Sequence, residues 1–380
     1  MSSRVLVVIG TRPEAIKMAP VVEALRKLAP EIETRVALTG QHTALVDQVR
    51  DVLTLESDDN LGVMQPGQSH SDVVERALKG LGEVIRRWGP DVVLVQGDTA
   101  TALAASLAAY FERVRVGHVE AGLRTSDKWA PFPEEIFRRV ADVVADWHFA
   151  PTRRAVEALR REGVPETHIH LTGNTVVDAL RLVAGRERPI TDQALRSVVD
   201  DRASRLVLLT AHRRESFGEP LRQVFHGVRA LADHVPDVRI VYPVHPNPNV
   251  REPALELLSG HPRILLTPPL DYADLVTALE HATLVLTDSG GIQEEAPTFG
   301  TPVLVLRDVT ERPEAIDAGV AEIVGTDAKR IVERAVALLA AGPRARVANP
   351  FGDGKAGERI ADILAADLLG RPRATRDWQP

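Results

Sequence analysis

The stretch VLVVIGTRPEAIK, residues 5–17, indicates the fold class of the chain. It opens with five consecutive apolar residues, Val5 to Ile9, and this run ends at Gly10. A helical pattern follows from Pro13 to Leu28, and proline suits the first turn of a helix because its missing N–H has no partner there. The stretch therefore predicts a buried β-strand followed by a helix, the repeating unit of a parallel α/β sheet.

Short runs rich in β-branched residues recur in both halves of the chain, separated mostly by helix-length amphipathic stretches. Continuous rather than alternating hydrophobicity is typical of parallel strands covered on both faces. The polar stretch 186–204 interrupts the series, and 380 residues exceed the size at which one core usually keeps growing. The sequence predicts two Rossmann-like, doubly wound α/β domains, residues 1–185 and 186–355, followed by a helix and tail, residues 356–380, that can pack on either. The expected strands are residues 5–9, 36–38, 92–95, 114–116, 168–171, 206–209, 239–244, 264–266, 284–286, 303–306 and 322–324.

The composition excludes several classes of protein. The net charge is −7, and charges of both signs are interspersed, so no basic field is present to hold nucleic acid. The absence of cysteine excludes disulfides, thiolate metal sites and a cysteine nucleophile. No apolar run approaches the roughly 18 residues of a membrane span, and the first run is too short for a signal peptide. We expect a cytoplasmic protein that binds neither nucleic acid nor membrane.

The loop after the first expected strand lacks the three-glycine spacing of a dinucleotide site, so we expect no nicotinamide cofactor there. Arg12 and Lys17 flank the start of the following helix, where a guanidinium and the helix dipole favour a phosphate. The alternative is two solvated surface cations.

A second candidate phosphate loop follows the run at 284–286. Ser289, Gly290 and Gly291 form a small-residue turn before a helix, where exposed backbone N–H groups favour an anion. Glu295, one helical turn later, can receive ribose hydroxyls. The alternative is an ordinary helix start with Ser289 as the cap.

Acidic residues follow expected strands between these two loops. Asp98 lies in QGDT, Glu120 in HVEAGLRT and Glu134 in PFPEE. Paired carboxylates in a cleft suit general acid and base chemistry. Taken singly, Asp98 can instead cap the helix that begins near residue 100, and Glu134 can stabilise a helix start after Pro133.

Two histidines follow expected strands of the second half. His212 can titrate near neutral pH beside a phosphate, although a lone histidine in such a place is more often structural or solvated. His245 holds an equivalent place one βα unit later, in a proline-rich loop, and is the weaker candidate.

Nine motifs stand in order along the chain: GTRPEAIKMAP, QGDT, HVEAGLRT, PFPEE, TGNTVVDA, TAHRRE, YPVHPNPNV, DSGGIQEEAP and TERPE. Together they resemble the motif series of the non-hydrolysing UDP-N-acetylglucosamine 2-epimerase family. The resemblance implies a GT-B-type pair of Rossmann-like domains with the active site in the interdomain cleft, a homodimer, and no nicotinamide cofactor. No strong metal-ligand cluster appears in the sequence, so we expect no metal and no cofactor. It implies that UDP-N-acetylglucosamine or a related UDP-sugar is the substrate. The implied catalytic residues are Asp98, Glu120, Glu134 and His212, and we assign substrate binding to Arg12, Lys17, His245, Ser289, Gly290, Gly291, Glu295 and Arg312.

The expected reaction inverts C2 of the sugar. Departure of UDP from C1 makes the C2 proton acidic enough for a carboxylate, and elimination gives a 2-acetamidoglucal to which UDP re-adds. The alternatives are a hydrolysing epimerase that releases UDP and N-acetylmannosamine, a 2-epimerase of a modified UDP-2-acetamido sugar, a GT-B glycosyltransferase, and a catalytically silent nucleotide-sugar sensor.

The chain departs from the family pattern at several positions. Phe137 stands where the family usually has Asn, and Ala315 where it usually has Gly. Many relatives are activated by a second substrate molecule held by a Gln-His-x-Gln stretch and a later Arg, but this chain has Ala44 and Gly67 at those two places. We therefore expect weak or absent substrate activation.

Overall fold

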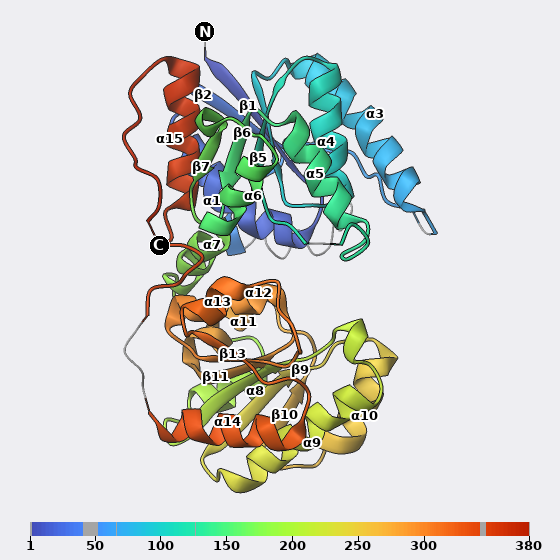
Figure 1. The fold of residues 1–380 in the computed structure, drawn as a ribbon, viewed down its shortest axis with the longest axis vertical. Helices are drawn as coiled ribbons and strands as arrows, with labels where there is room; N and C mark the ends of the chain where they lie inside the picture. Colours follow the sequence, from blue (N-terminus) through green and yellow to red (C-terminus); the bar gives the residue numbers. More distant parts are fainter. Residues whose placement is uncertain (1, 41–51, 66, 126, 343–346, 380) are drawn as a thin grey trace. The chain divides into compact units, whose positions relative to one another are not determined.

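The computed structural model describes residues 2–40, 52–65, 67–125, 127–342 and 347–379. The chain forms two compact units, one made of residues 1–182 together with 351–380 and the other of residues 183–350. The chain passes from the first unit to the second between residues 182 and 183 and returns between residues 350 and 351. The sequence places these boundaries at 185/186 and 355/356. The C-terminal helix α15 (Ala356–Leu369), red in Figure 1, belongs to the first unit and packs against α1 (Arg12–Arg26).

The first unit is built on a parallel sheet with the strand order β3-β2-β1-β4-β5-β6-β7. The chain starts in the middle of this sheet, moves to one side through β2 and β3, and then returns to the other side of β1. The strand order therefore reverses between β1 and β4, which is the switch point at which doubly wound sheets bind ligands. The strands are β1 (Ser3–Ile9), β2 (Ile32–Leu38), β3 (Asp59–Asn60), β4 (Val92–Gln96), β5 (Arg115–Val119), β6 (Trp147–Ala150) and β7 (Ile169–Leu171).

Helices cover this sheet and bury apolar faces against it. Helix α3 shows why the sequence folds as it does: Ser69 caps its first turn by accepting a hydrogen bond from the Asp72 amide, and Gly89 ends it in the left-handed conformation. Its buried face joins side chains of β1, β4 and α4 in one apolar cluster. The further helices of the unit are α3 (His70–Trp88), α4 (Ala100–Phe111), α5 (Glu134–Val144), α6 (Arg153–Arg161) and α7 (Thr175–Ala184), with the 3₁₀ turn η1 (Glu166–His168).

The second unit repeats the plan with a parallel sheet ordered β10-β9-β8-β11-β12-β13. Its switch point lies between β8 and β11, the counterparts of β1 and β4. The strands are β8 (Arg205–Thr210), β9 (Val238–Pro243), β10 (Ile264–Thr267), β11 (Ala282–Thr287), β12 (Val303–Val305) and β13 (Ala321–Ile323). The helices are α8 (Gln193–Val199), α9 (Glu219–His234), α10 (Pro248–Leu258), α11 (Tyr272–His281), α12 (Gly290–Glu295), α13 (Pro313–Asp317) and α14 (Ala328–Ala340), with the 3₁₀ turns η2 (Arg214–Ser216) and η3 (Ala296–Phe299).

The predicted fold class is confirmed, since both units are doubly wound parallel sheets of the Rossmann type. Two strands of the first sheet, β3 and β6, were not expected. The departures from the family pattern at Phe137 and Ala315 both serve packing: Phe137 lies against the core cluster of the first unit, and Ala315 is fully buried in α13. Within the described ranges, no helix is both long and apolar enough to cross a membrane.

The tail covers the edge strand of the first sheet. The Trp378 amide donates to the Leu171 carbonyl at 2.8 Å, and the Asp377 carboxylate accepts from the Leu171 amide at 3.4 Å. Trp378 is 5% exposed, so its indole is part of the core of this unit. The tail thereby satisfies backbone groups that an open sheet edge would leave unpaired.

Candidate functional site

The predicted residues of the first unit gather where the strands of its sheet end. Gly10 and Thr11 follow β1, Gly97 and Asp98 follow β4, and Glu120 follows β5. Because β1, β4 and β5 are neighbouring parallel strands, their carboxyl ends lie along one edge of the sheet, and the β1/β4 pair is its switch point.

Glu120 and Lys17 form a close ion pair at this edge. The Lys17 Nζ lies 2.7 Å from Oε1 and 2.6 Å from Oε2 of Glu120, and the buried Gln96 amide also donates to the Glu120 carboxylate. Glu120 has a positive φ of 68°, which is uncommon for a residue with a side chain. Such strain is found where surrounding contacts fix a functional residue. The ion pair shows that the structure brings Lys17 and Glu120, both predicted site residues, together.

Asp98 is held by a different helix. The Arg138 guanidinium, on α5, donates to the Asp98 carboxylate, whose side chain is 32% exposed. The alternative role of Asp98 as a helix cap is wrong, since Thr99 caps α4 by accepting from the Ala102 amide at 3.1 Å. The Asp98 carboxylate is thus oriented by a cation while part of it faces solvent.

Glu134 is the first residue of α5, with Pro133 before it. It is half-buried, and its place matches the alternative reading, in which a carboxylate favours a helix start. Arg138 and Asp142 follow at intervals of four residues, so the three side chains share one face of the helix. The helix that carries Glu134 therefore also orients Asp98.

Glu14 was not a predicted site residue, yet it joins the two loops at the switch point. Its carboxylate accepts the Gly10 amide at 2.9 Å, the Thr11 amide at 2.5 Å and the Thr99 hydroxyl at 2.7 Å. The side chain is almost fully buried, and burial raises the pKa of Glu14 to about 7 although hydrogen bonds from Thr99, Thr11 and Gly10 oppose this rise. Arg12, next to it, is half-buried at the first position of α1.

His118 was also missed, and it lies in the centre of a buried charged network. Its Nδ1 is 2.6 Å from the Asp142 carboxylate, which also accepts from Arg124 at 2.7 Å, and its Nε2 is 2.7 Å from the Gly97 carbonyl. Burial opposes the charged imidazolium, but Asp142 and the Gly97 carbonyl raise the pKa of His118 above its ordinary value. Both ring nitrogens then act as donors.

The switch point of the second unit is organised around Asp288, which follows β11 and is 1% exposed. One carboxylate oxygen accepts the backbone amides of His212 at 2.6 Å and Arg213 at 2.8 Å, so it joins the loop after β8 to the loop after β11. Asp288 thus plays the part in this unit that Glu14 plays in the first.

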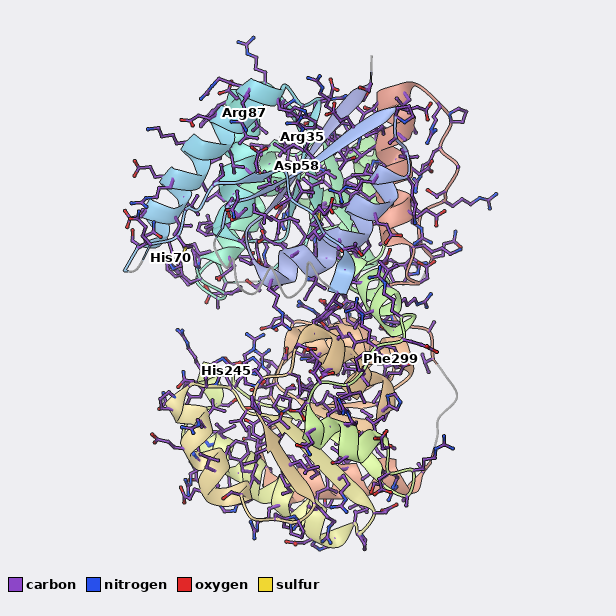
Figure 2. All side chains as sticks on the ribbon, turned by 180° about the vertical axis from the view of Figure 1, so that it is seen from behind. Arg35, Asp58, His70, Arg87, His245 and Phe299 are labelled. Carbon is purple, nitrogen blue, oxygen red and sulfur yellow. The ribbon has the colours of Figure 1, made fainter. Side chains whose placement is uncertain are left out.

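His212 and His245 stack on each other with ring centroids 5.4 Å apart and an interplanar angle of 11°. Figure 2 marks His245, an exposed residue in the loop after β9. Burial lowers the pKa of His212, and His245 and Arg213 lower it further against the opposing effect of Asp288. Without a ligand, the His212 imidazole is therefore mostly neutral at neutral pH.

Two guanidinium groups face Gly290. A methyl group built on Gly290 would lie 3.8 Å from Nη2 of Arg213 and 3.8 Å from Cζ of Arg312, and Arg312 is oriented by an ion pair with the buried Glu294. Glu295 lies near Gly291, whose added methyl group would be 3.7 Å from its Oε1.

Ser289 occupies the N-cap position of α12, as the cap alternative predicts, but its side chain makes no capping hydrogen bond. Helix α12 has only six residues, so its dipole is weak and a phosphate here depends mainly on Arg213 and Arg312.

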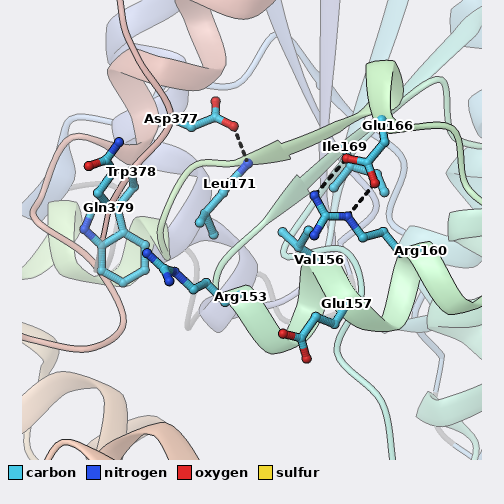
Figure 3. A pocket seen from close by; sticks show the side chains of 10 residues that line it. All are labelled: Arg153, Val156, Glu157, Arg160, Glu166, Ile169, Leu171, Asp377, Trp378 and Gln379. Carbon is cyan, nitrogen blue, oxygen red and sulfur yellow. Dashed lines mark hydrogen bonds and ion pairs between the residues drawn. The ribbon is translucent and has the colours of Figure 1, made fainter.

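A separate pocket of about 530 Å³ lies in the first unit between α6, β7 and the tail (Figure 3). Its lining mixes charged and apolar side chains, and two of the lining residues, Arg160 and Glu166, form an ion pair at 2.5 Å. None of its lining residues was predicted for the site. Within the described ranges, no group of three or more His, Asp and Glu side chains is arranged to hold a metal ion. The predicted Gln41 to Ala44 stretch lies outside these ranges, and Gly67 has a positive φ of 77°.

Comparison with known proteins agrees with the geometry. The family model described as UDP-N-acetylglucosamine 2-epimerase matches residues 24–365. The UDP-N-acetylglucosamine 2-epimerase of Escherichia coli strain K12 is 47% identical over 371 residues, with 95% of this chain and 98% of that protein covered.

Two solved structures carry ligands. S. aureus MnaA in complex with UDP has a TM-score of 0.88 at 40% identity and covers 99% of this chain and 100% of its own. The UDP-GlcNAc 2-epimerase from Neisseria meningitidis bound to UDP-GlcNAc has a TM-score of 0.85 at 40% identity and covers 97% and 100%. The chain therefore belongs to the UDP-N-acetylglucosamine 2-epimerase family.

Proposed function

We propose that this chain interconverts UDP-N-acetylglucosamine and UDP-N-acetylmannosamine by elimination and re-addition of UDP, without releasing UDP to solvent. One observation carries the proposal: Asp98 and Glu120 follow the neighbouring parallel strands β4 and β5, so both residues lie along one edge of the sheet, next to its switch point. The Neisseria relative bound to UDP-GlcNAc supports the choice of substrate.

The chemistry requires an acid and a base on C2. In the elimination, a carboxylate takes the C2 proton, the C1–O bond to the diphosphate breaks, and a C1–C2 double bond forms. In the reverse addition, a carboxylic acid on the other face returns a proton to C2 while a diphosphate oxygen bonds to C1. Two groups on opposite faces invert the centre, and no atom is lost.

We assign the C2 protons to Asp98 and Glu120, and Glu134 to orienting the sugar or sharing a proton. Lys17 and Gln96 hold the Glu120 carboxylate, and Arg138 holds that of Asp98. Which of the two acts first depends on the direction of the reaction.

The departing diphosphate needs positive charge. Arg213 and Arg312 face Gly290, and His212 lies in the same loop as Arg213. His212 is mostly neutral without ligand because burial lowers its pKa. A bound diphosphate raises that pKa, since an anion favours the imidazolium, so His212 becomes protonated when the substrate binds. In this proposal Arg12 and Glu295 contribute phosphate and ribose contacts, as the family resemblance implies.

The proposed homodimer has a candidate surface on the first unit. Tyr110 and Phe111 end α4 and are 61% and 64% exposed, and Val143, near the end of the neighbouring α5, is 85% exposed. Helices α4 and α5 follow parallel strands and pack together, so these apolar side chains lie at the same end of the sheet. A dimer in solution that Val143→Glu converts to monomers supports this surface, and a dimer that the variant leaves intact excludes it.

The function is tested by incubating the purified protein with UDP-N-acetylglucosamine and resolving the two epimers and UDP by chromatography. The expected result is a mixture of both UDP-sugars with no accumulation of UDP. Steady accumulation of UDP and N-acetylmannosamine identifies the hydrolysing reaction instead, and an unchanged substrate overturns both. Asp98→Asn, which keeps the shape of the side chain, is the control for contaminating activity.

A further inference from the structure

His118 is a buried residue of β5 whose two ring nitrogens are both used. It is 0% exposed, and its contacts are the Asp142 carboxylate at Nδ1 and the Gly97 carbonyl at Nε2. A charged side chain in a core is costly unless it is fully paired, and His118 meets this condition because each ring nitrogen has a partner.

The contact with Gly97 bears directly on Asp98. The Gly97 carbonyl belongs to the peptide group that continues into the Asp98 amide, and this group is planar and rigid. The Gly97 amide is also fixed, because it donates to the Val119 carbonyl at 3.0 Å. On the other side of Asp98, the Thr99 hydroxyl donates to Glu14 at 2.7 Å. His118 therefore contacts the peptide group that leads directly into Asp98.

Asp142 does not need His118 to remain paired. Its second oxygen accepts from Arg124 at 2.7 Å and from the Gly122 amide at 3.2 Å. The Gly97 carbonyl, in contrast, receives its side-chain hydrogen bond from His118. Helix α5 consequently reaches the QGDT loop twice, through Arg138 to the Asp98 side chain and through Asp142 and His118 to the Gly97 backbone.

We propose that His118 is a positioning residue that holds the Gly97–Asp98 peptide, and through it the Asp98 carboxylate, in the orientation needed for proton transfer at C2. This inference rests on the proposed function. It predicts that the bond to Gly97 matters for turnover, whereas the bond to Asp142 matters mainly for stability.

Two variants separate these bonds. In His118→Gln, the amide nitrogen takes the place of Nε2 and can still donate to Gly97, while the contact with Asp142 is lost. In His118→Asn, the amide nitrogen takes the place of Nδ1 and keeps Asp142, while the contact with Gly97 is lost. Each variant loses one buried hydrogen bond, so both are expected to lower the melting temperature, and His118→Gln lowers it more because its lost partner is a charged carboxylate.

The experiment measures kcat, KM and the affinity for UDP of the wild type and both variants, with the melting temperature as the control. We expect His118→Asn to lower kcat by about 10- to 100-fold, the scale of a misplaced catalytic group, with KM and UDP affinity nearly unchanged. His118→Gln should stay within about threefold of the wild-type kcat, because the hydrogen bond to Gly97 remains.

Equal losses in both variants, or no loss in either, overturn the inference while the wild-type epimerisation still stands. If His118→Asn does not fold, the kcat of Asp142→Asn provides the second test of the inference. In this variant the amide oxygen keeps the contacts with Arg124 and Gly122, so the amide nitrogen donates to Nδ1 of His118, which keeps on Nε2 the proton that it donates to Gly97. A kcat within about threefold of the wild type supports the inference, and a fall of about 10-fold or more overturns it. A wild type that does not epimerise its substrate refutes the proposed function itself, together with this inference.

Discussion

The buried Glu14 provides a quantitative test of the electrostatics at the first switch point. Replacing it with Gln preserves the shape, and the amide oxygen can still accept from Gly10 and Thr11, while the amide nitrogen reverses the direction of the hydrogen bond with the Thr99 hydroxyl. Of these changes, only the loss of the ionisable group depends on pH between about 5 and about 8. Any pH-dependent difference in the free energy of unfolding between the wild type and Glu14→Gln therefore reports the cost of the buried charge.

The direction of the Glu14 pKa shift determines whether stability rises or falls with pH. Burial raises the pKa of Glu14 from 4.5 to about 7, so between these values the folded protein binds a proton that the unfolded chain has released. Stability of the wild type then falls as pH rises through this window, and the loss is complete above about pH 7. The full loss in the free energy of unfolding is about 3 kcal/mol, and about 2.5 kcal/mol of it develops between about pH 5 and about pH 8.

The assay is urea unfolding followed by tryptophan fluorescence. All four tryptophans, at positions 88, 129, 147 and 378, belong to the first unit, so their emission reports the unfolding of the unit that contains Glu14. Glu14→Gln should gain about 2.5 kcal/mol relative to wild type between about pH 5 and about pH 8. Glu83→Gln, at an exposed position of α3, is the matched control and should show no such gain. If the free energy of unfolding of Glu14→Gln differs from that of the wild type by the same amount at both pH values, the reasoning is refuted.

Three further predictions follow from other parts of the molecule. Trp378→Ala should lower the free energy of unfolding of the first unit by about 3–5 kcal/mol, because the indole is buried, and a change below about 1 kcal/mol would contradict the structural role of the tail. Arg213→Ala should weaken UDP binding, measured by calorimetry, by about 10- to 100-fold, because Arg213 faces Gly290. Arg214→Ala, which changes the exposed neighbouring residue, should leave the affinity unchanged. Equal effects of the two variants would count against the placement of the diphosphate beside Gly290. Initial rates should depend hyperbolically on UDP-N-acetylglucosamine, because Ala44 and Gly67 replace polar residues, and strongly sigmoidal rates would contradict this.

Much of the fold follows from the sequence because buried parallel strands leave a strong local signal. The run Val5 to Ile9 is apolar throughout since both faces of β1 are covered. Strand β6 leaves no such signal: its four residues include Trp147 and His148, and they are buried only because β5 and β7 pair on either side. The two-residue β3 is likewise defined by its partner β2 rather than by its own side chains.

The site was predicted only in part for a similar reason. Asp98 and Glu120 could be found because they directly follow strands. The roles of Glu14 and His118 depend on contacts with residues far away in the sequence, such as Thr99 and Asp142, and these require the strand order β1-β4-β5. One signal was available, since the spacing of Arg138 and Asp142 puts both on one helix face.

The most direct test of the account is to run the reaction in deuterated water and to inspect C2 of the recovered UDP-sugars by NMR. Proton transfer at C2 by enzyme carboxylates predicts that the UDP-N-acetylmannosamine formed carries deuterium at C2. Epimerised product that retains its original hydrogen at C2 would contradict the account, because the centre would then have inverted without the proton transfer assigned to Asp98 and Glu120.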